Sequence, residues 1–165
     1  MVARTCTGWL YQSSSSDFGS TWTAPLPVGG VERVREGGIR HPLAPPNLAA
    51  VPGGCKRNTT GRNNETATTT MLVLLTEPHF NPEETLLGAR QILGLQTSCD
   101  RGESWRNYQQ LAGSKDNVHL SYMSAFSDVA TQALHITSRT GITTAGNPTG
   151  TISTAYYRIP YASIV

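Results

Sequence analysis

The chain has 165 residues, which is the length of one ordinary domain with a hydrophobic core. Its 13 basic and 11 acidic residues give a formal net charge of +2, too small a surplus to predict nucleic acid or an anionic membrane as a partner. No apolar run approaches the roughly 18 residues of a membrane span, and the first twelve residues lack the apolar core of a signal peptide.

Turn-forming and β-forming residues dominate the composition. Charged residues make up only 15% of the chain, and its polarity comes mainly from Ser, Thr, Asn and Gln. The 16 glycines and 10 prolines predict many turns, and the threonine-rich segments favour strands over helices. We therefore expect an all-β fold.

The first expected elements are two strands joined by a tight turn. Residues 8–15 predict a strand, in which the aromatic Trp9 and Tyr11 alternate with Leu10 and Gln12. A turn follows at Asp17 and Gly19, because an Asp side chain accepts hydrogen bonds from backbone N–H groups one to three residues on and glycine adopts positive φ. After Trp22, residues 23–28 predict a short edge strand that is limited by its prolines.

The middle of the chain predicts a second group of strands with a polar insertion. The five apolar residues 71–75 indicate the buried centre of a strand. Asn81 and Pro82 suit the start of a short helix or turn. The expected elements are, in order, a loop (29–46), a strand (47–51), a polar insertion near 53–68, a strand (68–78), the short helix or turn (79–90) and a strand (91–97).

The last third of the chain predicts another tight turn and four more strands. Asp100 and Gly102 provide the same turn signals as Asp17 and Gly19. The strands are expected at residues 106–113, 118–126, 133–139 and 152–165, with a Gly-Asn-Pro turn before the last one.

One eight-residue pattern occurs twice, at residues 15–22 and 98–105. Both copies read Ser, any residue, Asp, any residue, Gly, any residue, Ser or Thr, Trp. From ordinary residue frequencies, one such match is expected in roughly ten thousand chains of this length, so two matches indicate an internal repeat. The residues that define the two copies are Ser15, Asp17, Gly19, Thr21 and Trp22, and Ser98, Asp100, Gly102, Ser104 and Trp105.

This pattern resembles the Asp-box, also called the BNR repeat, of sialidases and related β-propeller proteins. In that family the box forms the turn between the third and fourth strands of a four-stranded antiparallel blade. It faces away from the active centre. The resemblance implies that Asp17 and Asp100 are structural residues, and not the acid pair of a glycosidase.

The spacing of the two boxes predicts an incomplete propeller. Asp17 and Asp100 lie 83 residues apart, whereas one propeller repeat needs about 40 to 50 residues. We expect residues 1–30 to end one blade from its third strand onward, residues 31–113 to form a second blade with the polar insertion, and residues 114–165 to begin a third. A closed propeller needs more blades. The chain is then a fragment of a larger propeller, or it closes by self-association, the N-terminal strands of one copy completing the C-terminal blade of another.

Two arginines are candidates for substrate binding. Tyr157-Arg158-Ile159-Pro160 resembles the Phe/Tyr-Arg-Ile-Pro motif of sialidases, whose arginine binds the carboxylate of sialic acid. By that resemblance Arg158 is the carboxylate ligand, although the motif here follows both boxes, whereas in the family it precedes them. It is otherwise part of an ordinary strand or a chance match. Arg40 is a candidate for binding an anionic group of a ligand. The alternative is that it is an ordinary surface arginine.

The cysteines and histidines do not indicate a metal site. Neither the three cysteines, Cys6, Cys55 and Cys99, nor the four histidines show the spacing of a metal site, and we expect no metal and no cofactor. The cysteines are expected to be free or partly paired thiols. Sequons at Asn58 and Asn64 are compatible with a glycosylated extracellular surface. We expect an extracellular or secreted protein, this chain being part of a longer one.

The resemblance implies a glycoside hydrolase that acts on terminal sugars of glycans, with a carbohydrate as ligand. A non-catalytic propeller that binds carbohydrate or protein is the alternative, and an inactive truncated product is another. No catalytic residue can be assigned from the sequence.

Overall fold

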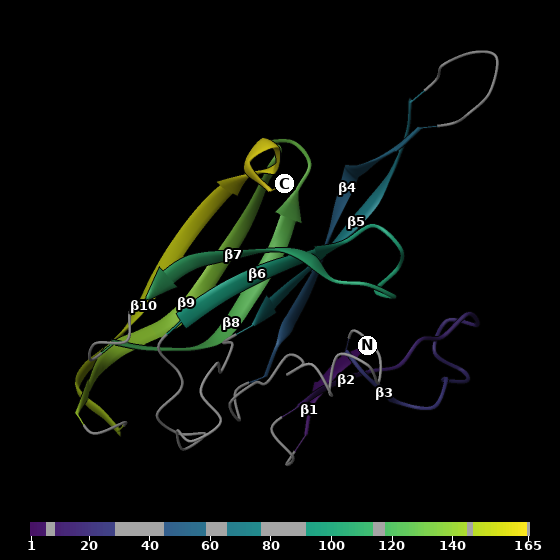
Figure 1. The fold of residues 1–165 in the computed structure, drawn as a ribbon. Coiled ribbons are helices and arrows are strands. Elements are labelled where there is room, and N and C mark those ends of the chain that lie inside the picture. The colour runs from purple at the N-terminus through teal and green to yellow at the C-terminus, as the bar shows by residue number, and fades with distance from the viewer. Residues whose placement is uncertain are drawn as a thin grey trace.

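The fold is all-β and is built from three antiparallel sheets (Figure 1). The computed structural model describes residues 1–5, 9–28, 45–58, 66–76, 92–113, 118–144 and 147–164. The strands are β1 (Val2–Arg4), β2 (Leu10–Gln12), β3 (Leu26–Pro27), β4 (Asn47–Asn58), β5 (Thr66–Thr76), β6 (Ile92–Ser98), β7 (Arg106–Gly113), β8 (Val118–Asp128), β9 (Ala133–Thr144) and β10 (Asn147–Pro160), and a short 3₁₀ helix, η1 (Tyr161–Ser163), follows.

Each sheet follows the chain without a crossover. The sheet orders are β1-β2-β3, β4-β5-β6-β7 and β10-β9-β8. The central sheet has four strands, whereas the first and last sheets have three each among the described residues. The expected all-β, antiparallel fold is confirmed.

The polar insertion expected near 53–68 differs from the structure. β4 continues through it to Asn58, and β5 begins at Thr66, so much of the segment extends the β4–β5 hairpin. The register shifts between Val51 and Cys55, and Gly53 has a φ of 71° there. A β-bulge therefore absorbs the Pro-Gly-Gly sequence without ending the strand.

Other boundaries also differ from the expected ones. β1 precedes β2 and pairs with it, so a strand lies before the one that was expected to open the chain. β10 ends at Pro160, which lacks the N–H group that a ladder requires, and η1 replaces the expected end of that strand. The helix or turn expected at 79–90 lies outside the described residues.

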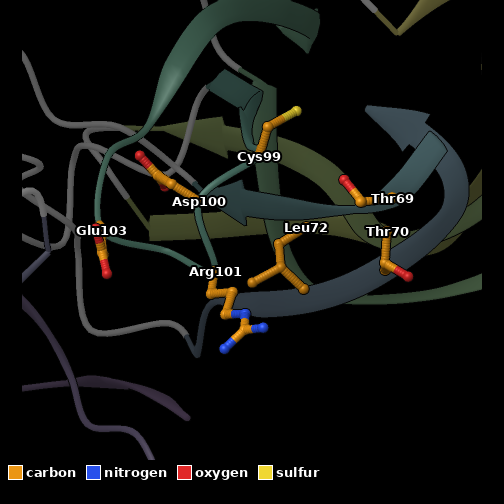
Figure 2. A pocket seen from close by; sticks show the side chains of 7 residues that line it. All are labelled: Thr69, Thr70, Leu72, Cys99, Asp100, Arg101 and Glu103. Carbon is orange, nitrogen blue, oxygen red and sulfur yellow. The ribbon is translucent and has the colours of Figure 1, made fainter. Parts of the chain in front are cut away.

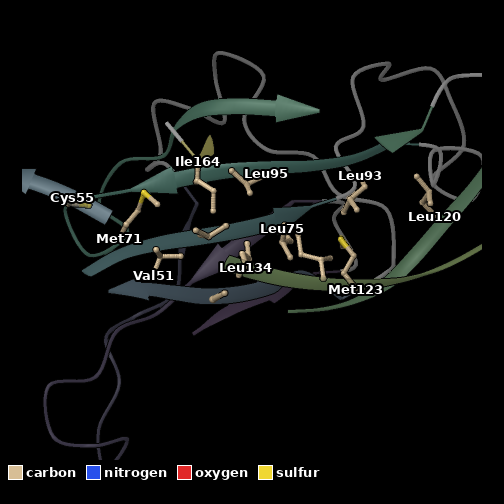
Figure 3. Packing of buried hydrophobic residues seen from close by; sticks show 13 residues of the cluster. Val51, Cys55, Met71, Leu75, Leu93, Leu95, Leu120, Met123, Leu134 and Ile164 are labelled. Atoms are coloured by element: carbon tan, nitrogen blue, oxygen red, sulfur yellow. The ribbon is translucent and has the colours of Figure 1, made fainter. Parts of the chain in front are cut away.

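The hydrophobic core lies mainly between the central sheet and the β8–β10 sheet. Thirteen buried residues form this cluster, and Figure 3 shows Val51, Leu75 and Leu95 of the central sheet beside Leu134 of β9. A second, smaller cluster joins the central sheet to the β1–β3 sheet. It contains Leu74 and Trp105. Both faces of the central sheet are therefore covered, and the three sheets form consecutive layers.

A disulfide bond reinforces the central sheet. Cys55 of β4 and Cys99, which follows β6, are bonded with their Cα atoms 5.7 Å apart and with a sequence separation of 44. β5 lies between β4 and β6, so the bond joins the two strands that flank it. Of the two expectations for the cysteines, partial pairing is the one that fits, and Cys6 lies outside the described residues.

Candidate functional site

The first repeat folds into a turn that closes on its own side chains. The Ser15 hydroxyl donates to Asp17 Oδ1 at 2.8 Å and accepts from the Gly19 N–H at 2.7 Å. Thr21 donates its backbone N–H to Asp17 Oδ1 at 2.8 Å and its hydroxyl to Asp17 Oδ2 at 2.7 Å. The carboxylate thus ties both ends of the turn together.

The second repeat makes the same set of bonds. Ser98 donates to Asp100 Oδ1 at 2.7 Å and accepts from the Gly102 N–H at 2.8 Å. Ser104 donates its N–H to Asp100 Oδ1 at 2.9 Å and its hydroxyl to Asp100 Oδ2. The two turns join β2 to β3 and β6 to β7. Both therefore connect antiparallel neighbours within a sheet.

The backbone of the two turns also agrees. Gly19 and Gly102 have φ values of 90° and 92°, as their sequence positions predict. Phe18 and Arg101, which precede them, also have positive φ, and no sequence signal indicated this. The Asp side chains accept from a backbone N–H four residues on, which is further than the expected one to three.

The hydrogen bonds of the turns hold both Asp side chains in the ionised form. For Asp17, bonds from the side chain and backbone of Thr21, and then from Ser15, lower the pKa from 3.8 to about 2. Burial would raise the pKa of Asp100, but bonds from Ser104 and Ser98 outweigh it and lower that pKa to about 2. A carboxylate with such a low pKa is a poor general acid at neutral pH.

The tryptophans of the two boxes differ in their surroundings. Trp105 is 4% exposed and packs in the cluster between the first and central sheets. Its indole N–H donates to Gln12 Oε1 at 3.3 Å, and Gln12 Nε2 donates to the Gly102 carbonyl at 2.8 Å. Trp22 is 49% exposed, and its indole N–H donates directly to the Gly19 carbonyl at 3.0 Å.

Arg158 lies on the β8–β10 sheet, near the end of β10. It is exposed, and its guanidinium donates to the Thr131 carbonyl at 3.2 Å. In the register of the sheet, Arg158 pairs with His135, which pairs in turn with Phe126. Arg40, the other candidate, lies outside the described residues.

Aromatic side chains lie on the same face of the sheet as Arg158. The Phe126 ring stacks on the His135 ring with centroids 4.8 Å apart, and Tyr156 Oη lies 2.6 Å from His135 Nδ1. Phe126 and Tyr156 are exposed, because Tyr156 and Arg158 alternate along β10 with Tyr157 and Ile159, which pack against the core. We call Phe126, His135, Tyr156 and Arg158 the outer aromatic face. Sequence reasoning missed this group, although the alternation in the last strand is its signal.

Asp128 closes the β8–β9 turn beside this face. It accepts from the Ala130 N–H at 2.9 Å and from the Thr131 hydroxyl at 2.6 Å. The hydrogen bond from the Thr131 hydroxyl lowers the pKa of Asp128. His135 Nε2 lies 3.7 Å from Asp128 Oδ2. The carboxylate is thus occupied in shaping the turn.

The end of β10 and the second box lie at the same end of the stacked sheets. An open depression of about 480 Å³ is lined by Cys99 and Asn107 beside the box and by Gln132 and Tyr161 beside the end of β10. Gln109 Nε2 also donates to the Ser163 carbonyl at 3.5 Å. The candidate carboxylate ligand is therefore on the box end of the molecule.

A second open depression adjoins the second box (Figure 2). Its volume is about 600 Å³, and Thr69 and Thr70 of β5 line it together with Arg101 and Glu103 of the turn. Two acids, Asp100 and Glu103, and one base, Arg101, line it. Both carboxylate oxygens of Asp100 accept hydrogen bonds within the turn.

Across the described ranges, no group of three His, Cys, Asp or Glu side chains is placed to hold a metal ion. None of the helical segments described has the length and apolar character of a membrane span. Comparisons with protein-family models, with curated proteins and with solved structures found no match for this chain.

Proposed function

We propose that this chain forms consecutive blades of a sialidase-like Asp-box propeller, and that the complete protein acts on terminal sugars of glycans. One observation carries the proposal. Both repeats fold into turns with the same hydrogen bonds, and the second joins the third and fourth strands, β6 and β7, of a four-stranded antiparallel sheet. That is where the Asp-box propellers, whose motif the eight-residue pattern resembles, have their boxes.

The disulfide supports an extracellular location for the proposed protein. Bonds of this kind persist in oxidising compartments and are rare in the cytosol. Cys55 and Cys99 are paired across the central sheet, and the chain also carries two sequons. A secreted or cell-surface protein would meet both glycans and oxidising conditions.

A second candidate, a propeller that binds carbohydrate without hydrolysing it, is favoured by the position of Arg158. In the family the boxes face away from the active centre, whereas Arg158 lies at the box end. Its guanidinium donates to the Thr131 carbonyl, and exposed aromatic rings lie on the same face of the sheet. Asp128 is engaged in the β8–β9 turn. Aromatic rings beside a guanidinium suit a sugar that carries a carboxylate.

Hydrolysis of fluorogenic sialosides and arabinosides tests the first candidate, and binding to immobilised sialylated and neutral glycans tests the second. Arg158→Ala is expected to weaken recognition of acidic sugars roughly tenfold or more, because it removes a charge-assisted hydrogen bond to the carboxylate. Arg101→Ala is the matched control, since Arg101 is an exposed arginine on the tip of the second turn.

The outcomes separate the candidates. Turnover that Arg158→Ala abolishes supports the hydrolase. Binding without turnover, weakened by Arg158→Ala and not by Arg101→Ala, supports the binding propeller. A chain that is folded by circular dichroism yet neither hydrolyses nor binds any of these sugars would contradict both.

A further inference from the structure

The two outer sheets each present an exposed aromatic surface. On the β1–β3 side, Trp22 follows the turn of the first box and is half exposed. On the β8–β10 side, the outer aromatic face points away from the core. The two interfaces between sheets inside the chain are, by contrast, buried. The exposed surfaces therefore lie at the two ends of the stack.

The interface between the first and central sheets shows what covers a box in this fold. There the neighbouring sheet buries Trp105 and inserts the side-chain amide of Gln12 between the Trp105 indole N–H and the Gly102 carbonyl. Gln12 is the last residue of β2, the strand that precedes the first box. A polar side chain from the end of a strand thus satisfies both groups of the box.

The first box presents the same two groups to solvent. Trp22 Nε1 and the Gly19 carbonyl bond directly to each other, and no described residue takes the place that Gln12 has at the second box. All other bonds of the two turns agree. The Trp22 ring and the Gly19 carbonyl of the first box are therefore arranged to contact a neighbouring sheet that has a hydrogen-bond donor at the end of one strand.

The outer aromatic face provides a hydrogen-bond donor near the end of a strand, as the first box requires. Arg158 lies near the end of β10, the third strand of its sheet in chain order, much as Gln12 lies at the end of β2. Its guanidinium can donate to a carbonyl and stack on an indole ring. Tyr156 and Phe126 add exposed apolar area beside it.

We propose that a second copy of this chain docks head to tail, with the outer aromatic face of one copy covering the first box of the next. Arg158 stacks on the Trp22 indole and donates to the Gly19 carbonyl, where the Gln12 amide lies at the second box. The contact joins two different surfaces, so it leaves one of each exposed on a dimer and permits ring closure or further addition. The contact uses the same Arg158 as the sugar-binding candidate above, so a copy whose outer aromatic face is covered would not bind a sugar there.

Sedimentation of the intact, oxidised chain over a range of micromolar concentrations tests the proposal. The mass is expected to rise above that of a monomer as concentration increases. Trp22→Ala and Arg158→Glu should each raise the dissociation constant at least roughly tenfold, since each removes the cation–ring contact. The matched control is Arg101→Glu. Arg101 is exposed at the tip of the second turn and belongs neither to the first box nor to the outer aromatic face.

Mixing the two weakened variants gives the sharpest outcome. Trp22→Ala keeps an intact outer aromatic face and Arg158→Glu keeps an intact first box, so an equal mixture should form a heterodimer where each variant alone is monomeric. A monomeric mass for the unmodified chain at every concentration would overturn the proposal. So would association that both variants leave unchanged while circular dichroism shows them folded.

Discussion

At the scale of single residues, three aspartates of the described part of the chain build turns. Asp17 and Asp100 each use both carboxylate oxygens to accept bonds from residues of their own turn. Asp128 does the same in the β8–β9 turn. Each of these groups is held ionised, which suits an acceptor and not a proton donor.

The low pKa of Asp100 predicts a pH-dependent contribution to stability. Because the pKa is lower in the folded chain than its ordinary 3.8, the contribution is fully present above that value and is lost as pH falls through about 2. Asp100→Asn should therefore lower the free energy of unfolding at pH 7 by about 1 kcal/mol, after allowance for solvent screening. Urea unfolding at pH 7 and in steps down to pH 2 measures the deficit, which should shrink over that range.

Asp17→Asn is the matched variant for this experiment, since Asp17 has the same position and the same hydrogen bonds in the first turn. Its deficit should follow the same direction with pH. A deficit for Asp100→Asn that is constant from pH 7 to pH 2 would show that the ionised carboxylate is not the stabilising species.

At the scale of elements, close contacts across strand pairs fix where glycine is needed. A Cβ atom on Gly54, in the β4 bulge, would lie 2.7 Å from Met71 Cβ. A Cβ atom on Gly94, in β6, would lie 2.6 Å from the Tyr108 ring. The two collisions differ in kind, because Met71 is 4% exposed in the core whereas Tyr108 is 39% exposed at the surface.

Alanine substitutions at these two glycines should therefore lower the free energy of unfolding by different amounts. Gly54→Ala is expected to destabilise the chain by about 1–3 kcal/mol, because it overpacks a region whose neighbouring Cβ cannot move away. Gly94→Ala should cost less, since the Tyr108 ring can swing toward solvent. Thermal unfolding of both variants makes the comparison, and an equal or reversed order would contradict it.

At the scale of the whole molecule, two apolar interfaces hold the three described sheets together, and a disulfide reinforces the central one. The larger core lies on one face of the central sheet and the cluster with Trp105 on the other. The disulfide lies within the central sheet that both interfaces share. Loosening that sheet should therefore loosen both neighbours.

Loss of the disulfide should lower stability substantially. It closes a loop of 44 residues, for which chain entropy predicts about 4 kcal/mol of stabilisation. Replacing Cys55 and Cys99 by Ser should lower the melting temperature by about 10 °C, given the size of the chain. The measurement is best made in a Cys6→Ser background, which prevents thiol exchange. A melting temperature that neither the double variant nor a reductant changes would contradict this account.

The sequence predicted local features well and contacts between distant segments poorly. The turn at Asp100 and Gly102 was predictable because its bonds close within eight residues. The contact of Gln12 with Gly102 spans 90 residues and depends on how two sheets meet, which no periodicity determines. The group of Phe126, His135 and Tyr156 likewise depends on the register of three strands. Trp22 and Trp105 occupy the same position of the repeated pattern, so the sequence does not indicate that one is half exposed and the other buried. Their burial depends on which sheet packs against each of them.

The half exposure of Trp22 indicates that the box can fold without a neighbouring sheet covering it. The first turn keeps the hydrogen bonds that Ser98, Asp100 and Ser104 make in the second, although no described sheet buries its indole. Its shape is therefore set within the eight residues themselves. Such a segment can adopt the same conformation in a different protein. A protein engineer could graft it onto an unrelated β-hairpin, and gene duplication could copy it into new sheets, without supplying the surroundings from which it came.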